Sequence, residues 1–88
     1  MRQLVLSNRF QKQLKNFLQK HPELRDVFRE KLAILQKNPS DKILKPHKLT
    51  GKLKDFFAAS ITYEYRIVFY FDNDSVFLLA IGSHDEVY

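Results

Sequence analysis

Three apolar runs separated by short polar segments occupy the last third of the chain, and they constrain its fold more than any other feature. The runs cover residues 55–61, 65–71 and 76–81. In the second run Ile67 and Phe69 fall on the face opposite Arg66, which is the two-residue period of a β-strand. The polar residues 72–75 predict a hairpin loop before the last run. We therefore expect an antiparallel meander, with its last and most apolar strand placed centrally and covered on one face by helices.

A short apolar run at residues 3–6, suited to a first strand, and two amphipathic helices precede the meander. Ser7 is expected to cap the first helix, because its hydroxyl can accept a backbone N–H two or three residues further on. One apolar stripe of that helix is formed by Phe10, Leu14, Phe17 and Leu18. Pro22 disfavours helical geometry at the residue before it, so the first helix should end near Lys20 and the second should begin at the proline. The next Asn-Pro pair should end the second helix.

The predicted element order is β-α-α-β-β-β, which is typical of an α+β fold. We expect an antiparallel sheet packed against an N-terminal helical hairpin, because the connection between the two helices is short. The whole chain, residues 1–88, is long enough for one domain and no more. Residues 41–54 are rich in lysine and weakly patterned, so we expect an ordered loop there with one helical turn.

The two parts of the chain carry opposite net charge. Residues 1–54 contain fourteen Lys/Arg and four Asp/Glu, a net charge of +10, whereas residues 55–88 contain one Arg and six Asp/Glu, a net charge of −5. The basic part can neutralise nucleic-acid phosphates or bind an acidic protein partner, and both can use one surface. A solvated basic face with no specific partner is the simpler alternative.

Several classes of protein and site are excluded or lack support. The chain has no cysteine, so disulfides and thiolate metal sites are excluded, and no apolar run approaches the ~18–20 residues needed to cross a membrane. Its first ten residues lack the apolar core of a secretory signal, so we expect a cytoplasmic protein. No phosphate-binding loop, serine-hydrolase elbow, zinc-protease motif or other metal-ligand spacing is present, and we expect no cofactor and no metal.

A few reactive polar residues interrupt the apolar runs without being needed to form a sheet, and they suit chemistry on RNA. RNA supplies its own nucleophile, the 2′-OH. A metal-free nuclease therefore needs a base, an acid for the 5′-oxygen and a cation that stabilises the charge on the phosphate. His47 and His84 can carry the protons near neutral pH. Arg66 is the only Lys or Arg after Lys54, and its planar fork suits a scissile phosphate.

The remaining candidates have ordinary structural alternatives beside a functional role. Glu64 can act as the base or be a turn carboxylate. Tyr65 and Tyr88 can stack on bases, as aromatic residues of RNA-binding proteins do. His21 lies beside a proline between the two helices and is interpreted as a plain connection residue. Contacts with the phosphates of the RNA backbone are assigned to Lys48, Lys52 and Lys54.

An ordered set of short segments in the C-terminal half resembles a known family. The set is His47-Lys48-Leu49-Thr50-Gly51, Leu53-Lys54-Asp55, Tyr65-Arg66-Ile67-Val68-Phe69-Tyr70, Ile81-Gly82-Ser83-His84 and Glu86-Val87-Tyr88. It resembles toxins of the RelE/ParE superfamily and comes closest to the YafQ-like branch, over nearly the whole chain. The resemblance implies a toxin of a type II toxin–antitoxin pair that cuts mRNA in the ribosomal A site, and a cognate antitoxin that blocks it.

The resemblance also implies catalytic roles by matched position. They fall on His47, Glu64, Arg66, His84 and Tyr88. The histidine and acidic positions match the YafQ-like branch, whereas Arg66 and Tyr88 look more like the RelE branch. Ser60 stands where the YafQ-like pattern has a further histidine, so the set of proton-transfer groups is incomplete by that template.

Two other functions stay open from the sequence. The ParE branch of the same fold inhibits DNA gyrase without catalysis, and the fold alone does not separate these activities. A domain that only binds its antitoxin and DNA as a repressor is the other alternative. In every case we expect a cognate antitoxin to lie across the apolar and basic surface and to fold on binding, with its acidic residues facing the lysine-rich half. The mRNA and the ribosome are further expected partners, operator DNA is expected only through the antitoxin, and no membrane contact is expected.

Overall fold

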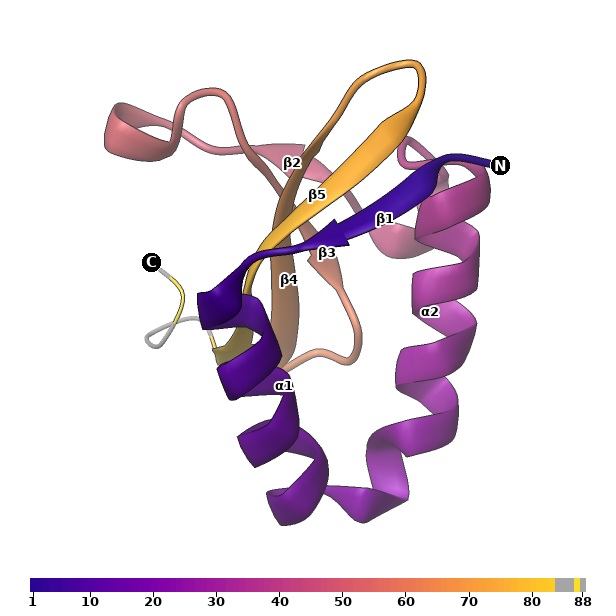
Figure 1. Ribbon diagram of the computed structural model, residues 1–88, viewed down its shortest axis with the longest axis vertical. Helices are drawn as coiled ribbons and strands as arrows, with labels where there is room; N and C mark the ends of the chain where they lie inside the picture. The colour runs from indigo at the N-terminus through magenta and orange to yellow at the C-terminus, as the bar shows by residue number, and fades with distance from the viewer. Residues whose placement is uncertain (84–86, 88) are drawn as a thin grey trace.

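Two helices, α1 (Asn8–Lys20) and α2 (Arg25–Lys37), cover one face of a five-stranded sheet in the computed structural model, which describes residues 1–83 and residue 87 (Figure 1). The strands are β1 (Gln3–Leu6), β2 (His47–Lys48), β3 (Phe57–Ser60), β4 (Tyr65–Phe71) and β5 (Ser75–Ser83), and their order across the sheet is β1-β5-β4-β3-β2. Short 3₁₀ helices η1, η2 and η3 lie at Pro22–Leu24, Lys42–Leu44 and Gly51–Leu53. The other face of the sheet, the open face, is not covered by α1 or α2.

The predicted α+β fold and its meander are confirmed, because β3, β4 and β5 pair antiparallel in chain order. The sheet as a whole is mixed rather than wholly antiparallel, since β1 pairs with β5 in parallel, with Leu4 opposite Val76. β5 therefore lies between β1 and β4, an interior position as predicted. The local sequence does not report the parallel pairing, because residues 3–6 and 75–78 are more than sixty positions apart and meet only in the folded chain.

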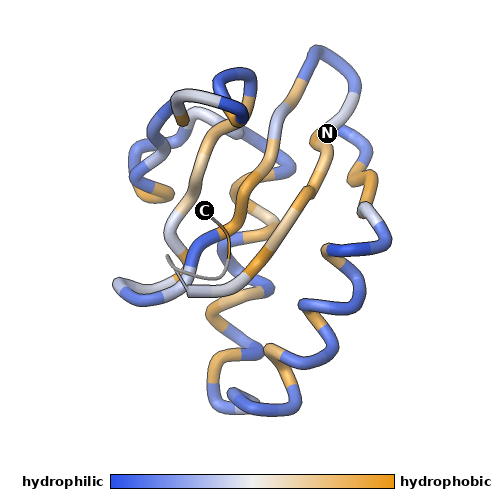
Figure 2. Tube along the Cα trace, turned by 90° about the vertical axis from the view of Figure 1, so that its left-hand side faces the viewer, coloured by the Kyte–Doolittle hydropathy of each residue, from blue (hydrophilic) through white to orange (hydrophobic). Residues whose placement is uncertain are grey.

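The helix boundaries follow the signals in the sequence. α1 ends at Lys20 as expected, and Pro22 opens η1, from which the chain continues into α2. α2 ends at Lys37, directly before the Asn-Pro pair. Figure 2 shows hydrophobic and hydrophilic residues alternating along both helices, the pattern of helices with one buried stripe. No helix in residues 1–83 or at residue 87 is long and apolar enough to span a membrane.

Ser7 fastens the start of α1 to β5. Its Oγ accepts a hydrogen bond from the N–H of Phe10 at 2.9 Å and caps the helix, as predicted. The same hydroxyl donates to the C=O of Leu79 at 2.9 Å, and the Ser7 N–H donates to the C=O of Leu78 at 3.0 Å. Leu79 is the extra residue of a β-bulge in β5, so the Ser7 hydroxyl gives a partner to a carbonyl in the disrupted part of the ladder.

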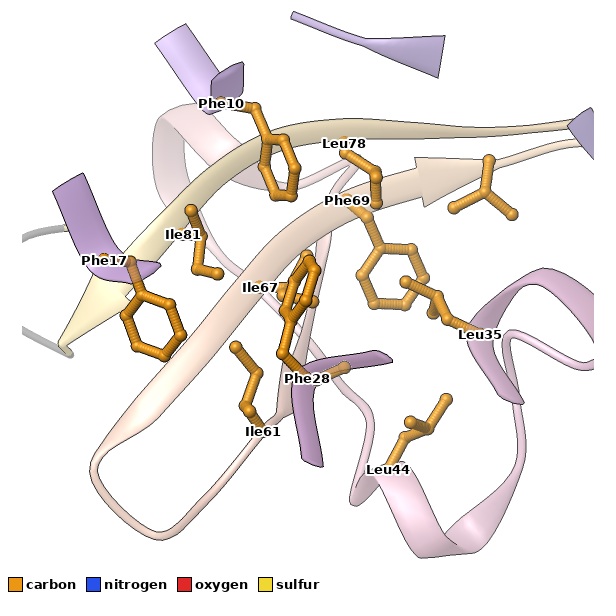
Figure 3. Packing of buried hydrophobic residues seen from close by; sticks show 12 residues of the cluster. Phe10, Phe17, Phe28, Leu35, Leu44, Ile61, Ile67, Phe69, Leu78 and Ile81 are labelled. Atoms are coloured by element: carbon orange, nitrogen blue, oxygen red, sulfur yellow. The ribbon is translucent and has the colours of Figure 1, made fainter. Parts of the chain in front are cut away.

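Aromatic and aliphatic side chains fill the space between the helices and the sheet (Figure 3). Ile67 and Phe69 of β4 face the helices, whereas Val68 packs on the open face with Ala80 and Val87, which is the predicted alternation. The largest buried side chains of the helix-facing core include Phe10, Leu35, Leu44, Phe69 and Leu78. Every buried side-chain N or O atom in the described residues has a hydrogen-bond partner, so this core contains no uncompensated polar group.

Residues 41–54 form more regular structure than the single helical turn that the sequence predicts. The segment contains η2 and η3, and β2 between them pairs antiparallel with β3, placing His47 opposite Ala58. Lys45 has a φ of 48°, in the left-handed region, and turns the chain from η2 toward β2. This pairing holds the lysine-rich segment against the edge of the sheet and brings His47 beside β3.

Candidate functional site

A cavity of about 380 Å³ opens at the edge of β3, beyond the short strand β2. Its walls come from α2, η2 and the residues after it, β3, the β3–β4 turn and β4. The polar and aromatic residues that line this β3-edge cavity are Lys31, Lys45, His47, Ser60, Thr62, Tyr63 and Arg66. No carboxylate of the described residues lines it, so its walls combine cations, a histidine and hydroxyl groups. Such a lining suits an anionic ligand.

Arg66 is held in this cavity by Ser60. The two residues face each other across β3 and β4, and the Arg66 Nη1 donates to the Ser60 Oγ at 3.0 Å. Arg66 makes no ion pair with a carboxylate of residues 1–83 or 87, so within the described chain it is not part of a structural ion pair. Its other N–H groups can therefore form a charge-assisted, forked pair of hydrogen bonds with a phosphate. Ser60 thus orients the guanidinium of Arg66 in the cavity.

His47 joins the β3-edge cavity to a wider basic surface. Its exposed side chain also lines a second open cavity of about 430 Å³, together with Lys48 and Lys52. A third cavity, of about 490 Å³, is lined by Lys48 and Lys54. The sequence assigns His47 to catalysis and these lysines to phosphate contacts. His47 and Lys48 each line two neighbouring cavities, so the loop presents all four residues along one surface.

Glu64 lies in the turn between β3 and β4, next to the cavity but outside its lining. Its side chain is exposed, and its backbone N–H donates to the Thr62 Oγ1 at 3.3 Å. The structure therefore brings Arg66 and His47 together and leaves the Glu64 carboxylate at the rim. A role of Glu64 as base stays a prediction.

Tyr65 lies on the helix-facing side of the sheet, away from Arg66. Its ring packs edge-on against Phe17 with 5.1 Å between centroids, and its hydroxyl is 3.0 Å from the Nε2 of His21. His21 in turn has its Nδ1 3.5 Å from a carboxylate oxygen of Glu23. His21 is thus more than the plain connection residue that the sequence suggested, because it ties the turn between the helices to β4. Stacking of Tyr65 on a base, predicted from the sequence, would need a site other than the β3-edge cavity.

His84 and Tyr88, both predicted catalytic residues, lie outside the described residues. Ser83, at the end of β5, pairs with Tyr65. Val87 is buried against Val68 and Ala80, so at this residue the chain lies against the open face of the sheet. The roles of His84 and Tyr88 stay predictions from the sequence.

Three residues of the cavity were missed in the sequence. Lys31 belongs to α2 and reaches the site only through the packing of that helix, so no local signal points to it. Nothing in the sequence distinguishes Lys45 from the other loop lysines. Tyr63 carried a usable signal, because a large aromatic residue in a polar turn between two strands has no obvious place in the core.

Comparisons with known proteins agree with this fold. The family model YafQ_toxin, described as a bacterial toxin of type II toxin-antitoxin system, YafQ, matches residues 2–88. A copper-bound mutant toxin from Helicobacter pylori is 31% identical, with a TM-score of 0.84 and 100% of both chains covered. YafQ from E. coli strain BL21(DE3) is 17% identical, with a TM-score of 0.86 over 100% of this chain and 99% of that chain.

Two further comparisons concern a toxin–antitoxin complex and curated protein sequences. The structure of the E. coli DinJ–YafQ complex matches at 17% identity, with a TM-score of 0.84 over 100% of this chain and 99% of that chain. No curated protein sequence matches this chain. Because the family model covers residues 2–88, and the fold and the toxin from Helicobacter pylori agree with it, the chain belongs to the YafQ family of toxins of bacterial type II toxin–antitoxin systems.

Proposed function

We propose that this toxin is an endoribonuclease that cleaves mRNA in the ribosomal A site. The observation that carries the proposal is the β3-edge cavity, where Arg66 and His47 meet beside two further lysines and no described carboxylate. A cation with free N–H groups next to a histidine is what cleavage of a phosphodiester by the adjacent 2′-OH requires. This substrate places the toxin in the cytoplasm, where ribosomes translate mRNA.

In the proposed reaction, His47 or Glu64 removes the proton of the 2′-OH, and the resulting oxygen attacks the neighbouring phosphorus. Arg66 binds the phosphate oxygens and stabilises the charge that builds up on them in the transition state. His84 donates a proton to the departing 5′-oxygen. The products are one RNA end with a 2′,3′-cyclic phosphate and one with a 5′-OH. Because the nucleophile comes from RNA and the cation from Arg66, the proposed reaction needs no metal ion.

The lysine-rich loop is the proposed track for the RNA backbone. Lys48, Lys52 and Lys54 have exposed side chains along the cavities next to His47. Lysine contacts with phosphates position a nucleic acid without reading its sequence. The loop therefore holds the strand, and the β3-edge cavity receives the scissile phosphate.

The nuclease proposal is tested by primer extension on a reporter mRNA in a translating extract, with and without ribosomes, for wild type and His84→Ala. Cuts inside the reading frame that are absent in the variant, with 2′,3′-cyclic phosphate ends, are expected. Cutting without ribosomes would mean a free ribonuclease. Ends with a 5′-phosphate and a 3′-OH, which attack by a metal-activated water produces, would contradict the metal-free reaction. Intact mRNA together with double-strand DNA breaks would instead support inhibition of gyrase.

We also propose that the cognate antitoxin covers the open face and the lysine-rich loop. The open face presents an apolar cavity of about 200 Å³, lined among others by Val5, Phe56, Tyr70 and Phe77. Tyr70 stacks on Phe77 with 4.4 Å between ring centroids, so aromatic rings form part of this face. An antitoxin segment with apolar residues for this face and acidic residues for the loop complements both surfaces. Operator DNA would then contact the complex through the antitoxin.

The affinity of this complex is expected to fall as salt concentration rises, because exposed charge pairs are screened. The double variant Lys48→Gln/Lys52→Gln should bind more weakly at low salt and show a smaller salt dependence than wild type. Titration calorimetry of the purified toxin with its antitoxin measures both. The matched control is Lys12→Gln/Lys15→Gln on the exposed side of α1, which makes the same change in net charge elsewhere. Equal salt dependence in both double variants would rule out the loop as the acidic contact.

A further inference from the structure

Tyr63 is an aromatic residue whose side chain is almost fully exposed. It is 93% exposed, and it forms none of the ring contacts or hydrogen bonds of residues 1–83 and 87. Tyr70 is the one other tyrosine or phenylalanine among the exposed large hydrophobic residues of the described chain, at 38%, and it stacks on a neighbour. A single exposed ring needs no explanation by itself, so its surroundings decide whether it has a function.

The turn that carries Tyr63 is held on both sides. The backbone N–H groups of Ile61 and Thr62 both donate to the C=O of Tyr65, at 2.9 and 3.4 Å. The Thr62 Oγ1 accepts from the Glu64 N–H at 3.3 Å. These bonds restrict the backbone before and after Tyr63. The ring is thus presented from a closed turn rather than from a loose loop, which lowers the entropy lost when a ligand binds it.

The position of the turn gives the exposed ring a candidate ligand. Tyr63 lines the β3-edge cavity together with Arg66 and His47, the groups assigned to the scissile phosphate. If the phosphate binds at Arg66, the base of a neighbouring nucleotide would lie at the rim of the cavity, within reach of the Tyr63 ring. Aromatic side chains bind such bases by stacking on their faces.

We infer that Tyr63 stacks on the base of a nucleotide next to the scissile phosphate and thereby positions the mRNA for cleavage. This inference rests on the proposed nuclease function and names one of its specificity-determining residues. Stacking uses the face of the base rather than its edge. Tyr63 therefore favours bases that stack strongly, without selecting one particular base. Arg66 and the lysines then hold phosphates, and Tyr63 holds a base.

The experiment uses synthetic mRNAs on programmed ribosomes and measures the cleavage rate against toxin concentration. Tyr63→Phe keeps the ring and should behave as wild type. Tyr63→Leu and Tyr63→Ala should need about tenfold more toxin for half-maximal rate, which corresponds to the loss of one stacked base. The maximal rate should change little, because the stacking contact is made equally in the ground state and in the transition state. The thermal midpoint should be unchanged, because the side chain is 93% exposed.

An abasic nucleotide, placed in turn at each position of the A-site codon, identifies the base. At one position, removal of the base should raise the concentration of wild-type toxin needed for half-maximal rate to the value for Tyr63→Ala. The concentration needed by Tyr63→Ala should not change there. Equal behaviour of wild type, Tyr63→Leu and Tyr63→Ala on intact mRNA would overturn the inference alone. A difference that persists unchanged on every abasic mRNA would also overturn it. Absence of cleavage by wild type would overturn the nuclease function, and this inference with it.

Discussion

Arg66→Gln is expected to lower the rate of mRNA cleavage by about 100- to 1,000-fold, the loss measured when one preorganised group that stabilises transition-state charge is removed. Glutamine is shorter than arginine, but it remains polar at this half-buried position of β4, so the fold should persist. Arg66→Lys should recover only part of the loss, because an ammonium group cannot form the forked pair with phosphate. Single-turnover cleavage of a reporter mRNA measures the three rates.

The matched control for Arg66 is Arg25→Gln, which removes the same charge at an exposed position at the start of α2. This variant should cleave at close to the wild-type rate. Ser60→Ala should cause a smaller loss than Arg66→Gln, since it frees the guanidinium without removing it. Cleavage by Arg66→Gln within a few fold of wild type would show that the charge on the scissile phosphate is stabilised elsewhere.

Phe69→Ala should destabilise the fold by about 3–5 kcal/mol, the usual cost of removing a buried phenylalanine and leaving a cavity. Phe69 is 0% exposed and lies in the middle of the core, with its ring 5.9 Å from that of Phe57 and 6.2 Å from that of Phe71. This loss is a large part of the stability of about 4–13 kcal/mol expected for a chain of 88 residues. Urea unfolding followed by circular dichroism measures the change.

Tyr70→Ala is the matched control, because it removes the adjacent aromatic residue of the same strand from the opposite face. Tyr70 is 38% exposed and its ring contacts those of Phe56 and Phe77, so its loss should cost about 2 kcal/mol, less than the loss of Phe69. The same variant should weaken the antitoxin complex if the antitoxin covers the open face. Similar losses of stability for the two variants would contradict the assignment of the two faces of β4.

Local patterns were sufficient for most of the fold. Ser7 and Pro22 mark the boundaries of α1 because capping and proline geometry act over only a few residues. The alternation around Phe69 predicts the buried face of β4, since neighbouring side chains of a strand must point to opposite sides. The parallel pairing of β1 and the strand β2 escaped prediction, because each depends on a partner segment far along the chain.

In the candidate site, too, some features follow from the sequence and others only from the fold. The sequence by itself determined which residues can do chemistry, namely Arg66, His47 and the loop lysines, because their charge and proton affinity are properties of the side chains. It also determined the family, because an ordered set of segments is a property of the chain. Only the tertiary structure decided which of these residues share a cavity. It joined Arg66 to Ser60, brought Lys31 and Tyr63 to the same rim, and turned Tyr65 to the other face. The physical reason is that strand pairing and helix packing set these distances, and both are satisfied only when the whole core has formed.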